Sequence, residues 1–380
     1  MKACSFTLPH DFCKDARKAY TLPARFYTSQ DAFNYEADEI FAKSWLCMCH
    51  VSEVAKPNQY VTREVLNESI LIVRGRDNQL RAFYNVCPHR GHRLIEGSGT
   101  CKNVIACPYH AWTFKLDGTM ASAPNSENIY DFNLDESCLT PMKVEEYAGF
   151  VFINMDPECK TTVEDQLPGL KDAALKARPE MYDLKLAARF VTRTPANWKN
   201  IVDNYMECYH CGPSHPDFAS SVQVSDYWHK MYKNWSLQWG RAISSDSSFA
   251  FEGDSSSFSG FWLWPCTMWN ATPVPGMLTA IFEYPLDAET TLQHYDIFFT
   301  NEELTQYQKD LIVWYRDVFR PEDLSLVESV QKGLHSRGYR GQGRIMADST
   351  GSGVSEHGIA YFHSLVAQYY TEDKLGKCDK

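Results

Sequence analysis

The sequence has no apolar run of the length that a membrane-spanning helix requires. Such a helix needs about 18 or more consecutive apolar residues, whereas the apolar runs here are short, as in the β-like segment 70–73. The first residues also lack an apolar stretch long enough for a secretory signal. These absences predict a cytoplasmic protein without a membrane partner.

The sequence also lacks an excess of basic residues. Its 37 Lys and Arg are outnumbered by 48 Asp and Glu, and the formal net charge at pH 7 is -11. Because nucleic-acid binding depends on a basic surface, this balance argues against a nucleic-acid partner. The chain has no internal repeat and no G-x-G-x-x-G fingerprint for a bound dinucleotide.

Apolar residues and cysteines are both plentiful. Hydrophobic residues make up 44% of the 380 residues and charged residues 22%, which excludes a disordered chain. There are 13 cysteines, an odd number, in a long chain without a secretory signal. That pattern favours reduced thiols and metal ligands over a framework of disulfides.

Apolar patterning divides the chain into three segments. Residues 1–43 read as a polar, partly helical lead-in, residues 44–156 as a small all-β domain, and residues 157–380 as a mixture of strands and helices. Within the β domain, strands are predicted at 60–65, 69–74, 80–86 and 146–154, with a hairpin at Asp117-Gly118.

The last segment mixes the two kinds of element. Strands are predicted at 277–286 and 290–300, and helices at 302–319, from Pro321 onward, and at 356–370. Asn301 is the predicted N-cap of the first of these helices, and Pro321 suits the first turn of the second. The Ser- and Gly-rich stretch 244–260 is predicted to be a mobile loop, with a lid over a site as the second interpretation.

Two short Cys-His pairs form the first metal-ligand pattern. Cys87 and His89 are followed by Cys107 and His110, each pair at the junction of a predicted strand and a loop. Two thiolates and two imidazoles suit zinc or an iron–sulfur centre. Zinc fingers usually pair Cys with Cys and His with His, whereas each loop here supplies one of each. We therefore predict a Rieske [2Fe-2S] cluster, with a zinc site as the alternative.

A second pattern lies between residues 197 and 215. Glu207 and His210 are three residues apart, which predicts that they share one face of a helix. His215 follows five residues later, and we expect Gly212-Pro213 to break the helix and turn it back. Two imidazoles and a carboxylate form the facial triad of non-haem Fe(II) oxygenases.

The carboxylate ligand of this triad is not fixed by spacing. The candidates are the four acidic residues Asp317, Glu322, Asp323 and Glu328, and those in the first turn of a helix also have an ordinary role beside the helix dipole. Cys208 and Cys211 form a Cys-x-x-Cys inside the histidine segment. We interpret that pair as packing residues and not as a redox site.

These stretches resemble the oxygenase component of Rieske non-haem iron oxygenases, and within them the carnitine monooxygenase oxygenase subunits. The resemblance covers nearly the whole chain and rests on motifs such as FYNVCPHRGH, CPYHAWTFKLDG, TPANWKNIVDNYMECYHCGPSHP and FRPEDLSLVESVQKG. It implies an α+β fold, with a Rieske β-domain before a catalytic domain whose antiparallel sheet is surrounded by helices. His92 and Tyr109 stand where respiratory Rieske proteins have a further pair of disulfide-linked cysteines.

The resemblance also implies roles for single residues. The cluster ligands fall on Cys87, His89, Cys107 and His110, and the iron ligands on His210, His215 and Asp323. Glu207 becomes the bridge for electron transfer between the iron site of one chain and the cluster of its neighbour in a head-to-tail homotrimer. Electrons come from NADH or NADPH through a separate flavin and ferredoxin-type reductase, and O2 is the co-substrate.

The implied reaction is oxidation of a small quaternary-ammonium substrate. Carnitine would give trimethylamine and malic semialdehyde, and the alternative is the same chemistry on γ-butyrobetaine or another betaine, including N-demethylation. An aromatic cage suits a trimethylammonium group, and Tyr205, Tyr209, Trp262 and Trp264 are the candidates, with ordinary core packing as the other interpretation. A pure electron-transfer protein or a zinc-stabilised structural protein would not need the second set of ligands.

Overall fold

The computed structural model describes residues 7–9, 12–243 and 257–370. The chain forms two compact units, a smaller one at Ala42–Asp165 and a larger one that combines Met1–Phe41 with Gln166–Lys380. The smaller unit thus extends beyond the boundary predicted at residue 156. Its last residues are tied to its own strands, since the Tyr147 hydroxyl donates to Glu164 at 2.6 Å and the Trp45 indole donates to the Thr161 carbonyl at 3.0 Å.

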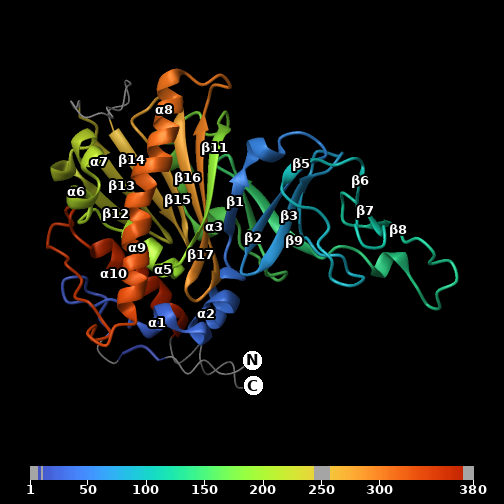
Figure 1. The fold of residues 1–380 in the computed structure, drawn as a ribbon, viewed down its shortest axis with the longest axis horizontal. Coiled ribbons are helices and arrows are strands. Elements are labelled where there is room, and N and C mark those ends of the chain that lie inside the picture. Colours follow the sequence, from blue (N-terminus) through green and yellow to red (C-terminus); the bar gives the residue numbers. More distant parts are fainter. Residues whose placement is uncertain (1–6, 10–11, 244–256, 371–380) are drawn as a thin grey trace. The chain divides into compact units, whose positions relative to one another are not determined.

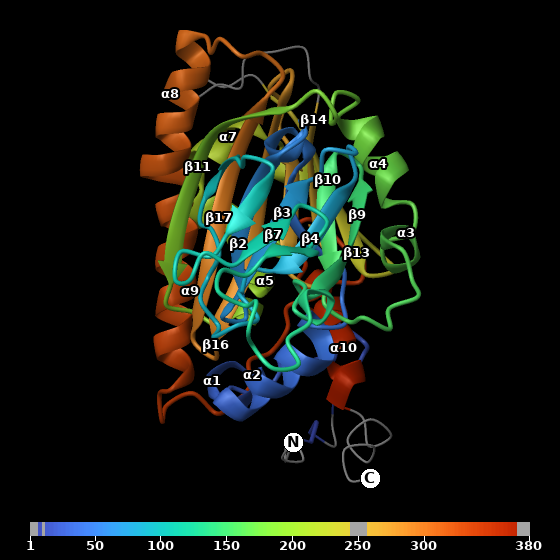
Figure 2. The same cartoon turned by 90° about the vertical axis from the view of Figure 1, so that its right-hand side faces the viewer.

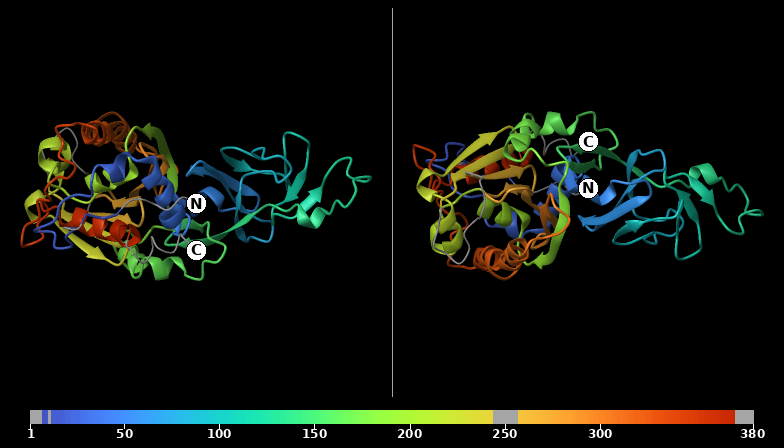
Figure 3. Two further views of the ribbon diagram at one scale, coloured as in Figure 1. Left: turned by 90° about the horizontal axis from the view of Figure 1, so that it is seen from below. Right: turned by 90° about the horizontal axis from the view of Figure 1, so that it is seen from above.

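The smaller unit consists of two antiparallel sheets. The seven-stranded sheet has the order β1-β10-β9-β4-β3-β2-β5 and the three-stranded sheet the order β6-β7-β8. Figure 3 shows the three-stranded sheet, in teal, extending from one end of the larger sheet. The strands are β1 (Leu46–His50), β2 (Gln59–Val65), β3 (Glu68–Arg74), β4 (Leu80–Tyr84), β5 (Ser98–Thr100), β6 (Val104–Ala106), β7 (Thr113–Lys115), β8 (Met120–Ser122), β9 (Pro141–Tyr147) and β10 (Phe150–Asn154).

Most of the predicted strands of this unit are confirmed, and one is wrong. The single strand predicted at 146–154 is a hairpin, because β9 and β10 pair with Tyr147 opposite Phe150. The turn between them is made by Ala148 and Gly149, both with positive φ, at 49° and 82°. Glycine adopts that conformation without a steric penalty, so the Ala-Gly pair inside an apolar run marks a turn. The Asp117-Gly118 hairpin is confirmed between β7 and β8.

The larger unit is built on one seven-stranded antiparallel sheet of order β11-β17-β16-β15-β14-β13-β12. Figures 1 and 2 show helix α9, the long orange helix, lying across one face of this sheet. The strands are β11 (Lys185–Thr194), β12 (Trp228–Tyr232), β13 (Trp235–Arg241), β14 (Ser257–Leu263), β15 (Thr267–Ala271), β16 (Met277–Asp287) and β17 (Thr290–Phe299). The prediction of an α+β fold with an antiparallel catalytic sheet is therefore confirmed.

Helices and single helical turns surround this sheet. They are α1 (Arg25–Thr28), α2 (Gln30–Glu36), η1 (Ala37–Phe41), α4 (Leu170–Ala177), α5 (Trp198–Tyr205), α6 (Cys211–Ser214), α7 (Pro216–Ser221), η4 (Val224–Asp226), α8 (Gln306–Trp314), η5 (Tyr315–Phe319), α9 (Arg320–Leu334), α10 (His357–Ala367) and η6 (Gln368–Tyr370). Helix α3 (Val163–Gln166) lies where the chain passes from one unit to the other, and η2 (Val51–Val54) and η3 (Leu134–Glu136) belong to the smaller unit.

The predicted start of the helix at 302–319 is wrong. Helix α8 begins at Gln306, and its N-cap is Thr305 and not Asn301, because the Thr305 side chain accepts from the Gln308 N–H while the Gln308 side chain accepts from the Thr305 N–H. This reciprocal capping box satisfies two amide groups at once. The chain then continues through the π-helical turn η5 directly into α9, which has Pro321 in its first turn as predicted.

The N-terminal helices are anchored to helix α5 by a buried ion pair. Lys199 Nζ lies 2.6 Å from a Glu36 carboxylate oxygen, and both side chains are fully buried. Trp198 Nε1 and the Tyr370 hydroxyl donate to the same carboxylate at 2.9 Å each. Burial lowers the pKa of Lys199 in spite of Glu36. This network fixes the helix from which the chain runs into the histidine segment.

Two further sequence predictions concern the loop at 244–260 and membrane-spanning helices. Of the predicted loop 244–260, residues 244–256 lie outside the described residues, while 257–260 are part of strand β14 and not of a loop. In the part of the chain that the structure describes, no helix is both long and apolar enough to traverse a lipid bilayer.

Candidate metal centres and substrate pocket

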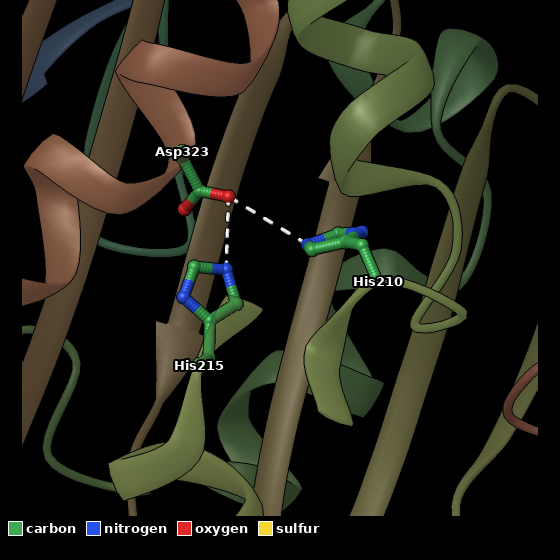
Figure 4. A group of neighbouring side chains, drawn as sticks. All are labelled: His210, His215 and Asp323. Atoms are coloured by element: carbon green, nitrogen blue, oxygen red, sulfur yellow. Dashed lines mark hydrogen bonds and ion pairs between the residues drawn. The ribbon is translucent and has the colours of Figure 1, made fainter. Parts of the chain in front are cut away.

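Three side chains of the larger unit converge on one point. The ligand atoms of His210, His215 and Asp323 all lie within 4.8 Å of one another. His215 Nε2 is 3.0 Å and His210 Nε2 is 3.6 Å from the same Asp323 oxygen, Oδ1 (Figure 4). The structure thus brings together the three residues that the sequence resemblance assigns to iron.

The backbone presents the two histidines differently from the prediction. Helix α5 ends at Tyr205, so Glu207 and His210 lie in the turn before α6 and not on one helical face. The Glu207 carboxylate accepts hydrogen bonds from the N–H groups of Tyr209 and His210, the second at 3.1 Å. Gly212 and Pro213 do not break the helix as predicted, because both lie within α6, and His215 follows as the residue between α6 and α7.

Two glutamates fix the orientation of the imidazoles. Glu207 Oε1 is hydrogen-bonded to His210 Nδ1, and Glu322 Oε2 lies 2.7 Å from His215 Nδ1. With each Nδ1 occupied, both Nε2 atoms are directed at the common point beside Asp323. Carboxylates behind metal-binding histidines set the tautomer and raise the basicity of the ligand. Glu322, one of the four carboxylates that sequence spacing left open, has this supporting position.

Asp323 is held by helix α5. Asn204 Nδ2, from α5, donates to Asp323 Oδ1 at 2.7 Å. Gln331, which lies on α9 like Asp323, accepts from the Asn197 N–H at 2.9 Å and from Asn200 Nδ2 at 2.6 Å. Burial by itself would raise the pKa of the Asp323 carboxyl, but hydrogen bonding and charge from His215, together with His210 and Asn204, lower it. The carboxylate is therefore ionised and available as a ligand.

The donor set fits a divalent transition metal. Two imidazoles and one carboxylate form a three-ligand face, and two further carboxylates, of Glu207 and Glu322, lie directly behind the rings. This excess of negative charge is compensated when a divalent cation binds, and the histidine and carboxylate set is the one that non-haem Fe(II) prefers. Without a metal, burial opposes protonation of His215, yet Asp323 and Glu322 raise its pKa to about 9.

One cysteine prediction is wrong. Cys208 and Cys211, interpreted from sequence as packing thiols, are joined by a disulfide that spans the turn carrying His210. Both residues are buried. The expectation of reduced cysteines holds for nine others of the described residues, which include Cys87 and Cys107.

The two Cys-His loops of the smaller unit repeat one backbone design. In the first, the Cys87 N–H donates to the His92 carbonyl at 2.8 Å and the Gly91 N–H to the Cys87 carbonyl at 3.0 Å. In the second, Cys107 N–H donates to the Trp112 carbonyl at 2.7 Å and the Ala111 N–H to the Cys107 carbonyl at 3.0 Å.

The same conformation closes each loop. Gly91 has a φ of 71° and Ala111 has a φ of 58°, so the equivalent residue is left-handed in both. For Ala111 that conformation is costly, and it persists because the loop geometry requires it. Two loops with the same backbone closure, each with one Cys and one His, fit a centre that is held from two sides.

Burial distinguishes the two kinds of ligand in these loops. Cys87 and Cys107 are 1% and 3% exposed, whereas His89 is exposed and His110 is half-buried. The ring centroids of the two histidines are 4.7 Å apart, and His89 stacks on Trp112 at 4.4 Å. A cluster held here would have its thiolate-bound iron inside the unit and its histidine-bound iron at the surface.

Local polar groups support that assignment. Arg90 donates to His110 Nε2 at 2.7 Å, which leaves Nδ1 of that ring free to bind a metal. Burial raises the pKa of the Cys87 thiol, although the N–H groups of His89 and Arg90 are directed at it and oppose the rise. Cys101, which lies between the two loops in sequence, donates to the Asn58 carbonyl at 3.3 Å and has a partner of its own. The four residues therefore fit a [2Fe-2S] cluster.

A pocket opens directly beside the His-His-Asp group. It is lined by the three ligands and by aromatic side chains from the sheet and from the helices above it, namely Tyr205, Tyr227, Phe258, Tyr295 and Phe319. The Tyr205 hydroxyl donates to Asn270 at 2.6 Å and the Tyr227 hydroxyl to Gln238 at 2.8 Å. Their polar atoms are thus satisfied by the protein, and their ring surfaces remain for a ligand.

Only one of the four predicted cage residues lines this pocket. Tyr205 does so, but Tyr209 is 53% exposed, and Trp262 and Trp264 lie outside the lining residues. The two tryptophans pack on each other at 6.1 Å and on Phe362 of α10. Phe258 was not predicted as a pocket residue, although it lies on the same face of strand β14 as Trp262. The sequence does not reveal which end of that strand reaches the iron site.

Comparisons with known proteins agree with this arrangement. A family model described as Rieske [2Fe-2S] domain matches residues 44–139, and one described as ring hydroxylating alpha subunit (catalytic domain) matches residues 181–372. The carnitine monooxygenase oxygenase subunit of Escherichia coli K12 is 67% identical over 368 residues, which is 97% of this chain and 98% of that protein.

Solved structures give the same result. A quaternary ammonium Rieske monooxygenase in complex with L-carnitine is 62% identical with a TM-score of 0.90, and covers 96% of this chain and 100% of its own. The same kind of enzyme in complex with γ-butyrobetaine is 61% identical with a TM-score of 0.89, again over 96% and 100%.

Proposed function

The chain belongs to the Rieske oxygenases, and we propose that it converts carnitine to trimethylamine and malic semialdehyde. It is an oxygenase subunit that joins a Rieske [2Fe-2S] domain to a ring-hydroxylating catalytic domain. As a member of that family it is a monooxygenase that uses a Rieske cluster, a mononuclear iron and O2, with electrons from NAD(P)H through a separate reductase. The observation that carries the substrate proposal is its 67% identity, over 97% of the chain, to a carnitine monooxygenase oxygenase subunit.

The ligands are proposed as follows. Cys87, His89, Cys107 and His110 bind the cluster, and His210, His215 and Asp323 bind the mononuclear iron. With O2 and electrons, the iron supplies the oxidising power to insert one oxygen atom into a C–H bond. Glu207 and Glu322 hold the two imidazoles in the tautomer that leaves each Nε2 free to bind.

The pocket suits a trimethylammonium group beside the iron ligands. A quaternary ammonium cannot donate a hydrogen bond, and aromatic faces attract it. Tyr205, Tyr227, Phe258 and Phe319 supply such faces. A cation held there would have its neighbouring methylene group beside the residues that would bind the iron, His210, His215 and Asp323. Hydroxylation of that carbon lets the C–N bond break, with its electron pair leaving on trimethylamine while the hydroxylated carbon becomes the aldehyde.

A substrate panel tests the reaction. The protein is assayed with a flavin and ferredoxin-type reductase, NADH or NADPH, O2, and carnitine, γ-butyrobetaine, glycine betaine or choline. Trimethylamine is expected from carnitine in amounts equal to malic semialdehyde. Formaldehyde in place of trimethylamine would favour the alternative, N-demethylation. A clearly higher kcat/KM for γ-butyrobetaine than for carnitine would change the assigned substrate within the same chemistry.

The assembly is proposed to be a head-to-tail homotrimer in the cytoplasm. In that arrangement the Glu207 carboxylate lies between His210 of one chain and a cluster histidine, His89 or His110, of the next. Two features of these residues support this bridge. Glu207 is hydrogen-bonded to the outward Nδ1 of His210, and His89 is exposed on its own unit.

Replacing Glu207 tests the bridge. Glu207→Gln keeps an oxygen that can accept from the N–H groups of Tyr209 and His210 but removes the charge. We expect it to bind both metal centres and to lose most of its turnover, because the reduced cluster cannot deliver its electron. The measurement is the rate of cluster reoxidation after reduced protein is mixed with substrate and O2. Reoxidation and product formation at the wild-type rate would exclude the bridging role.

A further inference from the structure

A row of polar side chains crosses the sheet at the base of the pocket. In the antiparallel register Thr192 of β11 lies opposite Gln293 of β17, and Gln293 lies opposite Glu283 of β16. Residues that are directly opposite on neighbouring strands project to the same face of a sheet. Gln293 and Glu283 line the pocket, so this row forms its polar end.

Arg320 of helix α9 lies over this row. Its Nη2 donates to Thr192 Oγ1 at 3.0 Å and to Gln293 Oε1 at 3.1 Å. Its guanidinium carbon is 5.0 Å from the Phe190 ring centre and 5.2 Å from that of Tyr295. The side chain is therefore positioned by two hydrogen bonds and two aromatic contacts, and it also lines the pocket.

Among the described residues, no acidic side chain forms an ion pair with Arg320. The residue is 6% exposed, and its Nε is buried without a hydrogen bond. An arginine stays charged even when burial lowers its pKa. An uncompensated buried cation is costly, and the Arg320 side chain lines a cavity in which an anion could compensate it.

Glu283 does not provide the missing negative charge at neutral pH. Its Oε1 accepts from Gln293 Nε2 at 2.7 Å, while its Oε2 is buried without a partner. Burial raises its pKa to about 8, against the opposing effects of Gln293 and Arg320. A neutral carboxyl leaves the positive field of Arg320 intact, and its O–H is a second donor at the same end of the pocket.

We propose that Arg320 binds the carboxylate of the substrate and thereby makes the enzyme selective for quaternary amines that carry one. The inference rests on the proposed function and assigns its second recognition element, since the aromatic rings account only for the cation. Arg320 precedes Asp323 by three residues on α9, which is about 4.5 Å along the helix axis. Carnitine has a chain of three carbon atoms between its nitrogen and its carboxylate carbon. A substrate with its cation at the iron can therefore reach Arg320 with its carboxylate.

The test compares two ligands in two proteins. Carnitine and carnitinamide have the same cation and the same chain, but the amide lacks the negative charge. Dissociation constants are measured by calorimetry for wild-type protein and Arg320→Met, both with cluster and iron bound. Removing one partner of a buried charge pair costs about 30-fold in affinity or more, so carnitine should lose at least that factor while carnitinamide loses about threefold or less. Equal losses for both ligands would overturn the proposal.

Two further variants separate recognition from folding. Arg320→Lys keeps the charge and should restore a clear preference for carnitine over carnitinamide, so a preference as low as that of the Met variant contradicts the proposal. Arg178→Met is the matched control, because Arg178 is also 6% exposed but donates to the Thr272 and Val274 carbonyls and does not line the pocket. It should leave the preference unchanged. A wild-type protein that binds neither ligand would contradict the proposed function itself.

Discussion

Replacement of Asp323 with alanine is expected to abolish turnover and to leave the Rieske cluster intact. Asp323 Oδ1 is the common neighbour of His215 Nε2 and His210 Nε2, at 3.0 Å and 3.6 Å. Without it the site keeps two neutral imidazoles, which bind Fe(II) much more weakly than the three-ligand face. Iron should fall from about three atoms per chain to about two, with sulfide unchanged at about two.

Asp317 offers a matched control for this variant. It is an acidic residue six positions earlier in the same helical segment, and sequence spacing alone did not exclude it as the ligand. Its side chain is 51% exposed and pairs with Arg316 at 2.7 Å. Asp317→Ala should keep full iron and full turnover. Loss of iron in Asp317→Ala, or full turnover in Asp323→Ala, would remove Asp323 from the ligand set.

Replacement of Cys87 with serine is expected to remove the cluster and all activity that depends on the reductase. The Cys87 thiol lies at the buried base of one of two matching loops, with the N–H groups of His89 and Arg90 directed at its sulfur. A hydroxyl does not replace a thiolate as an iron ligand at neutral pH, because its proton is held far more tightly. The visible colour and the EPR signal of the reduced protein should both disappear, and His110→Ala should behave in the same way.

The control for this variant is Cys101→Ser. Cys101 belongs to the same buried cluster of the smaller unit as Cys87 and Cys107, and its thiol donates to the Asn58 carbonyl. Serine can keep that hydrogen bond, so colour and EPR signal should persist at wild-type strength. A colourless Cys101→Ser, or a fully coloured Cys87→Ser, would mean that the ligands of the cluster are assigned wrongly.

The cluster loops could be predicted from sequence because their geometry is local. The Cys and His of each pair are two or three residues apart, and the hydrogen bonds that close the loop join Cys87 to His92 and Cys107 to Trp112. Such short-range patterns do not depend on how distant parts of the chain pack. The same applies to strand β2, whose alternation is visible in the sequence, and to the paired strands β16 and β17, which are two largely apolar segments joined by a short turn.

Long-range contacts set the limits of prediction. The carboxylate that joins His210 and His215 lies more than a hundred residues away, and spacing alone did not separate Asp323 from Glu322. The packing of α9 on α5, through Asn204 and Gln331, brings Asp323 to both rings. The end of helix α5 was misplaced because the Glu207 carboxylate binds the N–H groups of the following turn. The buried charge of Arg320 also becomes visible only once the sheet register is known.

A single-turnover experiment tests most directly whether the cluster and the iron site of this protein act together to cleave carnitine. Chemically reduced protein, without reductase, is mixed with carnitine and O2, and trimethylamine is quantified against oxidation of the cluster over the same time course. Trimethylamine should appear as the cluster is oxidised, in an amount that does not exceed the number of clusters present. Complete oxidation of the cluster without trimethylamine would contradict that joint action.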